Sequence, residues 1–85
     1  MWRPIAPPLD GEVIRQARIG KLLTQVEVAG QVAEQCADAG IKFDRSSLSL
    51  IENGRVKHPA VKVIPALAQV LGLEVAEMFK AGEAA

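Results

Sequence analysis

The sequence has few of the residues that build metal sites and disulfide frameworks. Its 85 residues include one cysteine, Cys36, and one histidine, His58. A single cysteine excludes a disulfide within the chain, and these two residues form no recognisable set of zinc ligands. Because free cysteine is often buried, we expect Cys36 to fill part of the core. No cofactor and no metal are expected.

Long apolar segments and catalytic motifs are also missing. No apolar run approaches the ~20 residues that span a bilayer, and the opening Met1–Pro4 lacks the apolar stretch of a signal peptide. We therefore expect a cytoplasmic protein that does not enter a membrane. The chain has no glycine-rich phosphate loop, no evident carboxylate pair and no nucleophile motif around His58. An enzyme is the weakest interpretation.

The formal net charge is zero, with ten basic and ten acidic residues. Lys and Arg supply much of the affinity for duplex DNA, so this balance counts against nucleic-acid binding. The distribution, however, is uneven along the chain. In the middle, Lys42, Arg45, Arg55, Lys57 and Lys62 outnumber Asp44 and Glu52, whereas Glu74, Glu77 and Glu83 outnumber Lys80 near the end. These counts allow a basic face with an acidic back; the alternative is a neutral surface with interspersed charges.

Length and composition fit one globular domain. Apolar residues make up 49% of the chain and charged residues 24%, as in ordinary folded proteins. Residues 1–9 contain three prolines and are expected to form an extended N-terminal arm. Its apolar residues, Trp2 among them, would pack on the domain or on a second subunit, or the arm is a partly ordered tail. The domain itself is expected over 10–80, followed by a short tail at 81–85.

Helical periodicity starts at Asp10 and predicts an all-α bundle of about five short helices. Asp10 would cap the first helix, which runs to about Lys21. Thr24 to Glu27 fits a capping box that starts the second helix, and Gly40 would close it near Ala39. Val28, Val32 and Cys36 recur at four-residue steps and predict a buried stripe of small side chains.

The remaining three helices are shorter. Asp44 would cap the third, from Arg45 to about Glu52, which ends at Asn53–Gly54 with Leu48 and Ile51 facing inward. The fourth has Pro65 in its first turn and Gly72 as its stop. A fifth would span Glu74 to Lys80. No segment alternates in the way that predicts a strand.

Several of these residues together resemble the lambda-repressor/Cro-like helix-turn-helix family over roughly residues 11–80. They are Thr24–Gln25 at the start of the second helix, the Ile51–Gly54 run, and Pro59 followed by Leu67–Ala68 and Leu71–Gly72. The resemblance implies that the third helix enters the DNA major groove. It also implies a sequence-specific transcriptional regulator, a repressor, that binds a two-fold operator as a homodimer.

The resemblance further implies roles for individual residues. Arg45 is the strongest candidate for base readout, because a guanidinium can bond both acceptors of a guanine edge. Arg18 and Glu52 would form a structural ion pair. The candidate base contacts are Gln25, Arg45, Ser46, Ser49 and Leu50; the candidate phosphate contacts are Thr24, Ser47, Arg55, Lys57 and His58; and the candidate dimer contacts are Val75, Met78 and Phe79, residues that more often belong to a plain core.

The sequence departs from the family pattern at a few places. More residues than usual separate Thr24 from Gly54, which a longer second helix and a connection that includes Phe43 would absorb. Leu50 stands where many relatives have a polar or basic base contact, so it would meet a thymine methyl group or leave the reading surface poorer. Leu22 and Glu74 replace the glycine and the hydroxyl cap that are frequent there, which affects local stability.

A protein-interaction module with the same fold is the alternative function. An antitoxin of a toxin–antitoxin pair or an adaptor would suit the zero net charge, the lengthened second helix and the apolar arm with Trp2. Such a partner would bind through the N-terminal arm. The two functions are compatible, because similar antitoxins also bind DNA.

Overall fold

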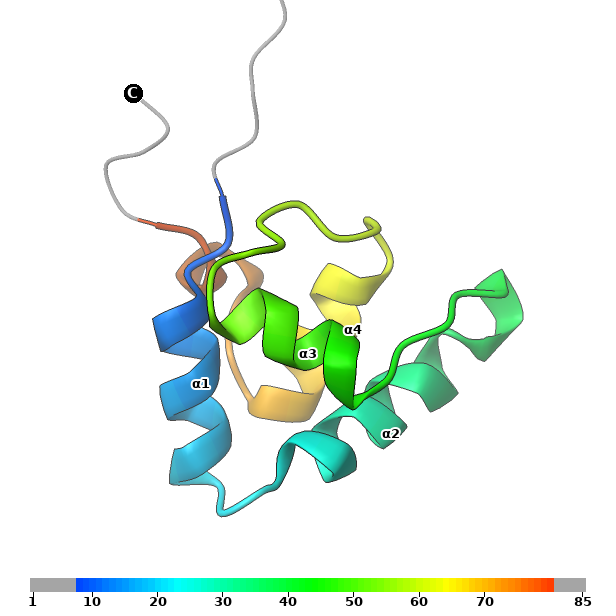
Figure 1. Cartoon of the computed structure of the whole chain (residues 1–85), viewed down its shortest axis with the longest axis horizontal. Helices are drawn as coiled ribbons and strands as arrows, with labels where there is room; N and C mark the ends of the chain where they lie inside the picture. The colour runs from blue at the N-terminus through cyan, green and yellow to red at the C-terminus, as the bar shows by residue number, and fades with distance from the viewer. Residues whose placement is uncertain (1–7, 81–85) are drawn as a thin grey trace, which may run out of the picture.

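The computed structural model describes residues 8–80, which form α-helices and 3-10 turns around one core (Figure 1). It contains no strand in this range, which confirms the predicted all-α class. No helix within it is long and apolar enough to cross a membrane. Most of the predicted arm and the 81–85 tail lie outside the described residues. In chain order the elements are α1 (Gly11–Gly20), α2 (Gln25–Gln35), η1 (Ala37–Ala39), α3 (Arg45–Glu52), α4 (Val63–Leu71) and η2 (Val75–Met78).

The predicted start signals of the first three helices are confirmed. The Asp10 carboxylate accepts hydrogen bonds from the Glu12 and Val13 amides at the start of α1. In the Thr24 capping box of α2, the Thr24 hydroxyl accepts from the Glu27 amide at 3.1 Å, and the Glu27 carboxylate accepts from the Thr24 amide at 2.8 Å. These bonds satisfy amides that have no partner within the helix.

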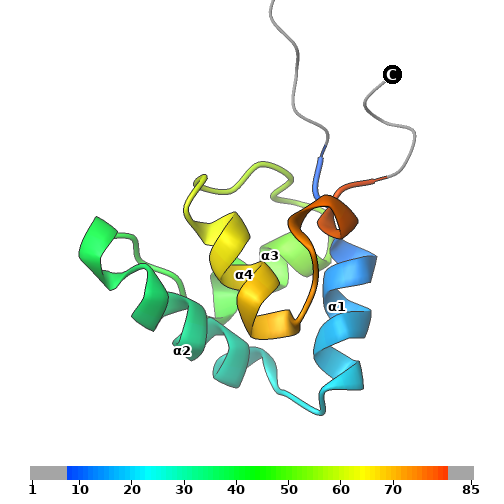
Figure 2. The same ribbon diagram turned by 180° about the vertical axis from the view of Figure 1, so that it is seen from behind.

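The core lies where α2 packs against both α3 and α4. Figure 1 shows α3 in front of α4, and Figure 2 shows the same pair from behind. The predicted stripe of α2 is buried, with Val28 and Val32 fully covered and Cys36 2% exposed. Leu48 and Ile51 of α3 and Leu67 of α4 are buried in the same core cluster.

The predicted end of the second helix differs from the structure. The α-helical part of α2 ends at Gln35, and the chain continues as the 3-10 turn η1 before Gly40 closes it with a φ of 70°. Tightening into a 3-10 turn is usual at a helix end, where carbonyls lack partners. The lengthening of this region therefore consists of α2, η1 and the extended connection to Asp44.

The predicted fifth helix is a 3-10 turn, η2, and not an α-helix. Phe79 leaves the turn in an extended conformation and forms an antiparallel bridge with Leu9. This pairing draws the chain out of helical geometry after a single turn. Leu9 is only 2% exposed and belongs to the core, although the sequence places it in the arm.

Gly11, the first residue of α1, lies directly against the end of α3. A Cβ atom at this position would clash with the backbone carbonyl oxygens of Ile51 and Glu52, the latter at 2.5 Å. Only a residue without a side chain lets the two helices approach this closely. The close approach fixes the start of α1 relative to the C-terminus of α3.

Candidate nucleic-acid interface

The outer face of α3 carries the side chains that the family resemblance assigns to base reading. Leu48 and Ile51 are buried and hold the helix on the core. On the other side Arg45 and Ser46 are exposed, and Ser49 is half-buried. Eight residues of α3 form about two turns, a length that fits across a major groove about 12 Å wide. In the structure, Arg45, Ser46 and Ser49 therefore all lie on the side of α3 that faces away from the core.

Leu50 is 39% exposed at the edge of this face. It borders a largely apolar surface hollow of about 210 Å³, which Phe43 and Val56 also line. Part of the Leu50 side chain therefore packs on the connection before α3 and on the loop after it. The remaining exposed part is apolar and has no hydrogen bond to offer a base edge.

The N-terminus of α3 is capped by the side chains of Asp44 and Ser47. The Asp44 carboxylate accepts hydrogen bonds from the Ser47 amide at 3.0 Å and from the Ser47 hydroxyl at 3.1 Å. The bond from the Ser47 backbone amide is the main cause that lowers the pKa of Asp44. The cap is therefore ionised at neutral pH, and its contribution is lost only when the pH falls through this lowered pKa. The Ser47 hydroxyl, a predicted phosphate contact, donates within the protein here.

Gln25 connects the start of α2 to the end of α3. Its side-chain amide donates to the Glu52 carboxylate at 3.1 Å, and the side chain is half-buried. Thr24, immediately before it, is exposed. The orientation of Gln25 beside α3 is thus set by Glu52 and not by solvent.

Arg18 and Glu52 form a bidentate ion pair that joins α1 to α3. The Arg18 Nε donates to Glu52 Oε2 at 2.7 Å and the Nη2 donates to Oε1 at 3.0 Å. A third bond runs from Arg18 Nη1 to the carbonyl of Leu23 at 3.0 Å. The Arg18 and Glu52 side chains are 14% and 4% exposed. The hydrogen bond to Glu52 is the main cause that raises the pKa of Arg18, so the cation persists at any physiological pH.

The loop after α3 has exposed basic side chains, and hydrogen bonds to α3 hold the backbone at its start. Gly54 adopts a φ of 82°, and the amides of Arg55 and Val56 donate to the carbonyl of Leu50 at 2.9 and 3.0 Å. This C-terminal closure satisfies a carbonyl at the end of α3. The side chains of Arg55, Lys57 and His58 are exposed beyond it. Their position next to α3 suits contacts to a nucleic-acid backbone.

The three candidate dimer contacts fall in different environments. Met78 is fully buried, so it belongs to the core and offers no surface to a second copy in this structure. Phe79 is half-buried and packs against the core beside Leu9. Val75 is 42% exposed. Of the three, Val75 presents the largest exposed fraction for a second subunit.

Two features of this region were not predicted from the sequence. One is Gly11, for which a glycine at the first position of a helix, a poor place by propensity, is the available signal. The other is the bond between Gln25 and Glu52, which depends on how α2 and α3 pack and has no signal in either segment alone.

Comparison with protein families and with curated proteins gave one match. Residues 11–79 match a family model described as a helix-turn-helix domain. The match spans every helix of the fold, from the first residue of α1 to the residue after η2. No curated protein matched the chain.

Proposed function

Because the chain belongs to the Cro/C1-type helix-turn-helix family, we propose that it is a sequence-specific DNA-binding regulator that inserts α3 into the major groove. The observation that carries the proposal is the exposed face of α3, where Arg45 and Ser46 lie. The Arg18–Glu52 pair joins the C-terminal end of this helix to α1. We also propose repression as its effect, following the resemblance to lambda-repressor/Cro-like proteins.

The test is a fluorescence-anisotropy titration against duplex DNA. The duplexes are random-sequence DNA and the region upstream of the protein's own gene, each at about 50 and about 200 mM salt. We expect preference for the upstream DNA, and at least about a hundredfold weaker binding at the higher salt, since several phosphate contacts release counterions. Absence of binding to either duplex at low salt would refute the proposal.

We expect Arg45→Ala to reduce the preference for specific DNA. Arg45 is exposed at the start of α3, and loss of a bidentate guanine contact would cost about 1–3 kcal/mol of discrimination, or roughly 5- to 150-fold. Specific and random duplexes compared by anisotropy measure this ratio. Arg15→Ala is the matched control, because Arg15 is exposed on α1 and pairs with Glu12 at 3.6 Å. A ratio equal to wild type in Arg45→Ala would remove Arg45 from the reading role.

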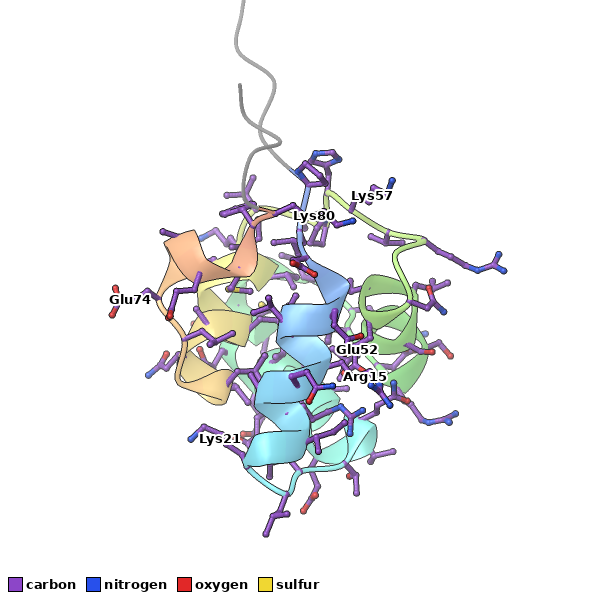
Figure 3. The ribbon with its side chains drawn as sticks, turned by 90° about the vertical axis from the view of Figure 1, so that its left-hand side faces the viewer. Arg15, Lys21, Glu52, Lys57, Glu74 and Lys80 are labelled. Carbon is purple, nitrogen blue, oxygen red and sulfur yellow. The ribbon has the colours of Figure 1, made fainter. Side chains whose placement is uncertain are left out.

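Lys57→Ala should weaken binding to all sequences equally. A lysine that neutralises one phosphate contributes about 0.9 to the slope of log affinity against log salt, which corresponds to about five- to tenfold in affinity near 0.1 M salt. Affinities at four salt concentrations give the slope. Lys21→Ala is the control, since Lys21 lies at the opposite end of α1 from Lys57 (Figure 3). A slope unchanged in Lys57→Ala would show that Lys57 makes no phosphate contact.

We also propose that the regulator binds DNA as a homodimer. One α3 contacts few base pairs, and doubling it across a palindrome multiplies specificity. The exposed fraction of Val75 supports a contact through η2. Sedimentation of the protein with a two-half-site duplex should give two chains per duplex, and one chain per duplex would contradict it.

Binding of a partner protein is the second candidate function. One observation favours it: Leu22 is 90% exposed and Val26 62% exposed around the turn between α1 and α2, and Leu22 adopts a φ of 60°. A large apolar side chain in this strained and exposed position gains nothing from the core. This function would be favoured over the first if the protein binds no DNA but co-elutes with a partner protein, and if a Leu22 substitution abolishes that co-elution.

A further inference from the structure

Two lysines that are far apart in the sequence are anchored to the same short segment. Residue 9 donates its amide to the carbonyl of Lys57 at 3.1 Å, and the amide of Lys80 donates to the carbonyl of Pro8 at 3.1 Å. The antiparallel bridge between Leu9 and Phe79 lies between these two bonds. Lys57 and Lys80 therefore flank the Pro8–Leu9 dipeptide, and Figure 3 shows both at the same end of the molecule.

Both lysines border one surface hollow of about 190 Å³. Its other walls come from the start of α1 and the end of α3, including Asn53 and Gly54. The hollow thus begins where the reading helix ends and where the loop with Arg55 and Lys57 starts. A group bound there would touch the same partner that α3 and this loop contact.

Three carboxylates, Asp10, Glu12 and Glu52, also line the hollow, but two of them are paired with arginines, so the two lysines leave the site with a net positive charge. Within residues 8–80 neither Lys57 nor Lys80 forms an ion pair. The carboxylates that line the hollow all have other partners: Asp10 caps α1, Glu12 binds Gln16 and Arg15, and Glu52 binds Arg18 and Gln25. Glu74, which precedes Lys80 in the acidic C-terminal stretch, lies at the left edge of Figure 3, away from both lysines.

We propose that Lys80 binds a DNA backbone phosphate next to the phosphate bound by Lys57. This inference rests on the proposed function and extends the interface beyond the matched residues 11–79 to the C-terminal segment. An ammonium group is a compact point charge that suits a phosphate oxygen, and it carries no sequence information. Lys80 thus adds affinity and fixes orientation without reading bases.

The test compares Lys80→Ala, Lys80→Arg and Lys21→Ala with wild type on specific and random duplexes at four salt concentrations. Lys80→Ala is expected to flatten the salt slope by about 0.9 and to weaken both duplexes about five- to tenfold near 0.1 M salt. Lys80→Arg should keep the slope, because the charge remains. Lys21→Ala should match wild type. The Lys80 side chain is exposed, so circular dichroism should give unchanged melting for both Lys80 variants.

The outcomes separate this inference from the function on which it rests. If wild type binds DNA and Lys80→Ala keeps its slope and affinity, the phosphate contact is refuted while the regulator proposal stands. A loss confined to the specific duplex would also refute it, because it would indicate a base contact. If wild type binds neither duplex at low salt, both proposals fail together.

Discussion

Gly11→Ala is expected to lower the melting temperature by at least about 12 °C. The new Cβ would meet the backbone carbonyls of Ile51 and Glu52, which cannot rotate aside as a side chain can. Helix α1 must then move away from α3 and disturb the packing of both. Overfilling a packed site costs about 1–3 kcal/mol, and we expect the upper limit here. In a domain of this size each kcal/mol shifts the melting temperature by about 4–8 °C.

The measurement is thermal unfolding followed by far-ultraviolet circular dichroism. Gly30→Ala is the matched control, because Gly30 lies on the exposed side of α2 and nothing stands within 4 Å of a Cβ there. The same substitution should stabilise the protein by about 0.5–1 kcal/mol at this helix-interior position. Equal melting temperatures for Gly11→Ala and wild type would contradict the close approach of α1 to α3.

The second large effect is expected from Glu52→Ala. This change leaves the Arg18 guanidinium, 14% exposed, without its carboxylate and also removes the acceptor for Gln25. Breaking a buried pair on one side costs about 3–5 kcal/mol, because the remaining charge is uncompensated, and we expect the lower limit for this partly buried pair. Such a loss is a large part of the stability of a typical domain. Urea unfolding at neutral pH measures it.

A double variant distinguishes an unpaired charge from lost packing. Arg18→Met/Glu52→Leu removes both charges and fills their space, so it should be more stable than either single alanine variant. If Arg18→Met/Glu52→Leu is instead no more stable than Glu52→Ala, the uncompensated charge of Arg18 is not the cause of the loss. DNA binding of Glu52→Ala should fall by more than its unfolded fraction accounts for, since the change also removes the carboxylate that orients Gln25, a candidate base contact.

The sequence predicted the helices well where local signals agree. Each predicted cap or stop bonds to residues a few positions away, and each lies at the expected helix end. These signals are Asp10, the Thr24–Glu27 box, Asp44, Asn53–Gly54 and Gly72. The interior stripe of α2 follows from periodicity alone. These features depend on bonds between near neighbours, so the order of residues is sufficient to find them.

The features that the sequence did not predict depend on contacts between distant residues. η2 becomes a 3-10 turn because Phe79 pairs with Leu9, and no pattern within residues 74–80 predicts this pairing. The charge count placed Lys80 with an acidic stretch, whereas the fold places it beside Lys57. Gly11 matters because of two carbonyls at the end of α3. Tertiary packing decides each of these positions.

The pairing of Leu9 with Phe79 also sets an order of events during synthesis. Leu9 is among the first described residues to leave the ribosome, and the segment that pairs with it is among the last. Until residues 78–80 emerge, the nascent chain lacks Met78 and Phe79, and the core beside α1 stays open. Native closure of the core therefore awaits the synthesis of residues 78–80.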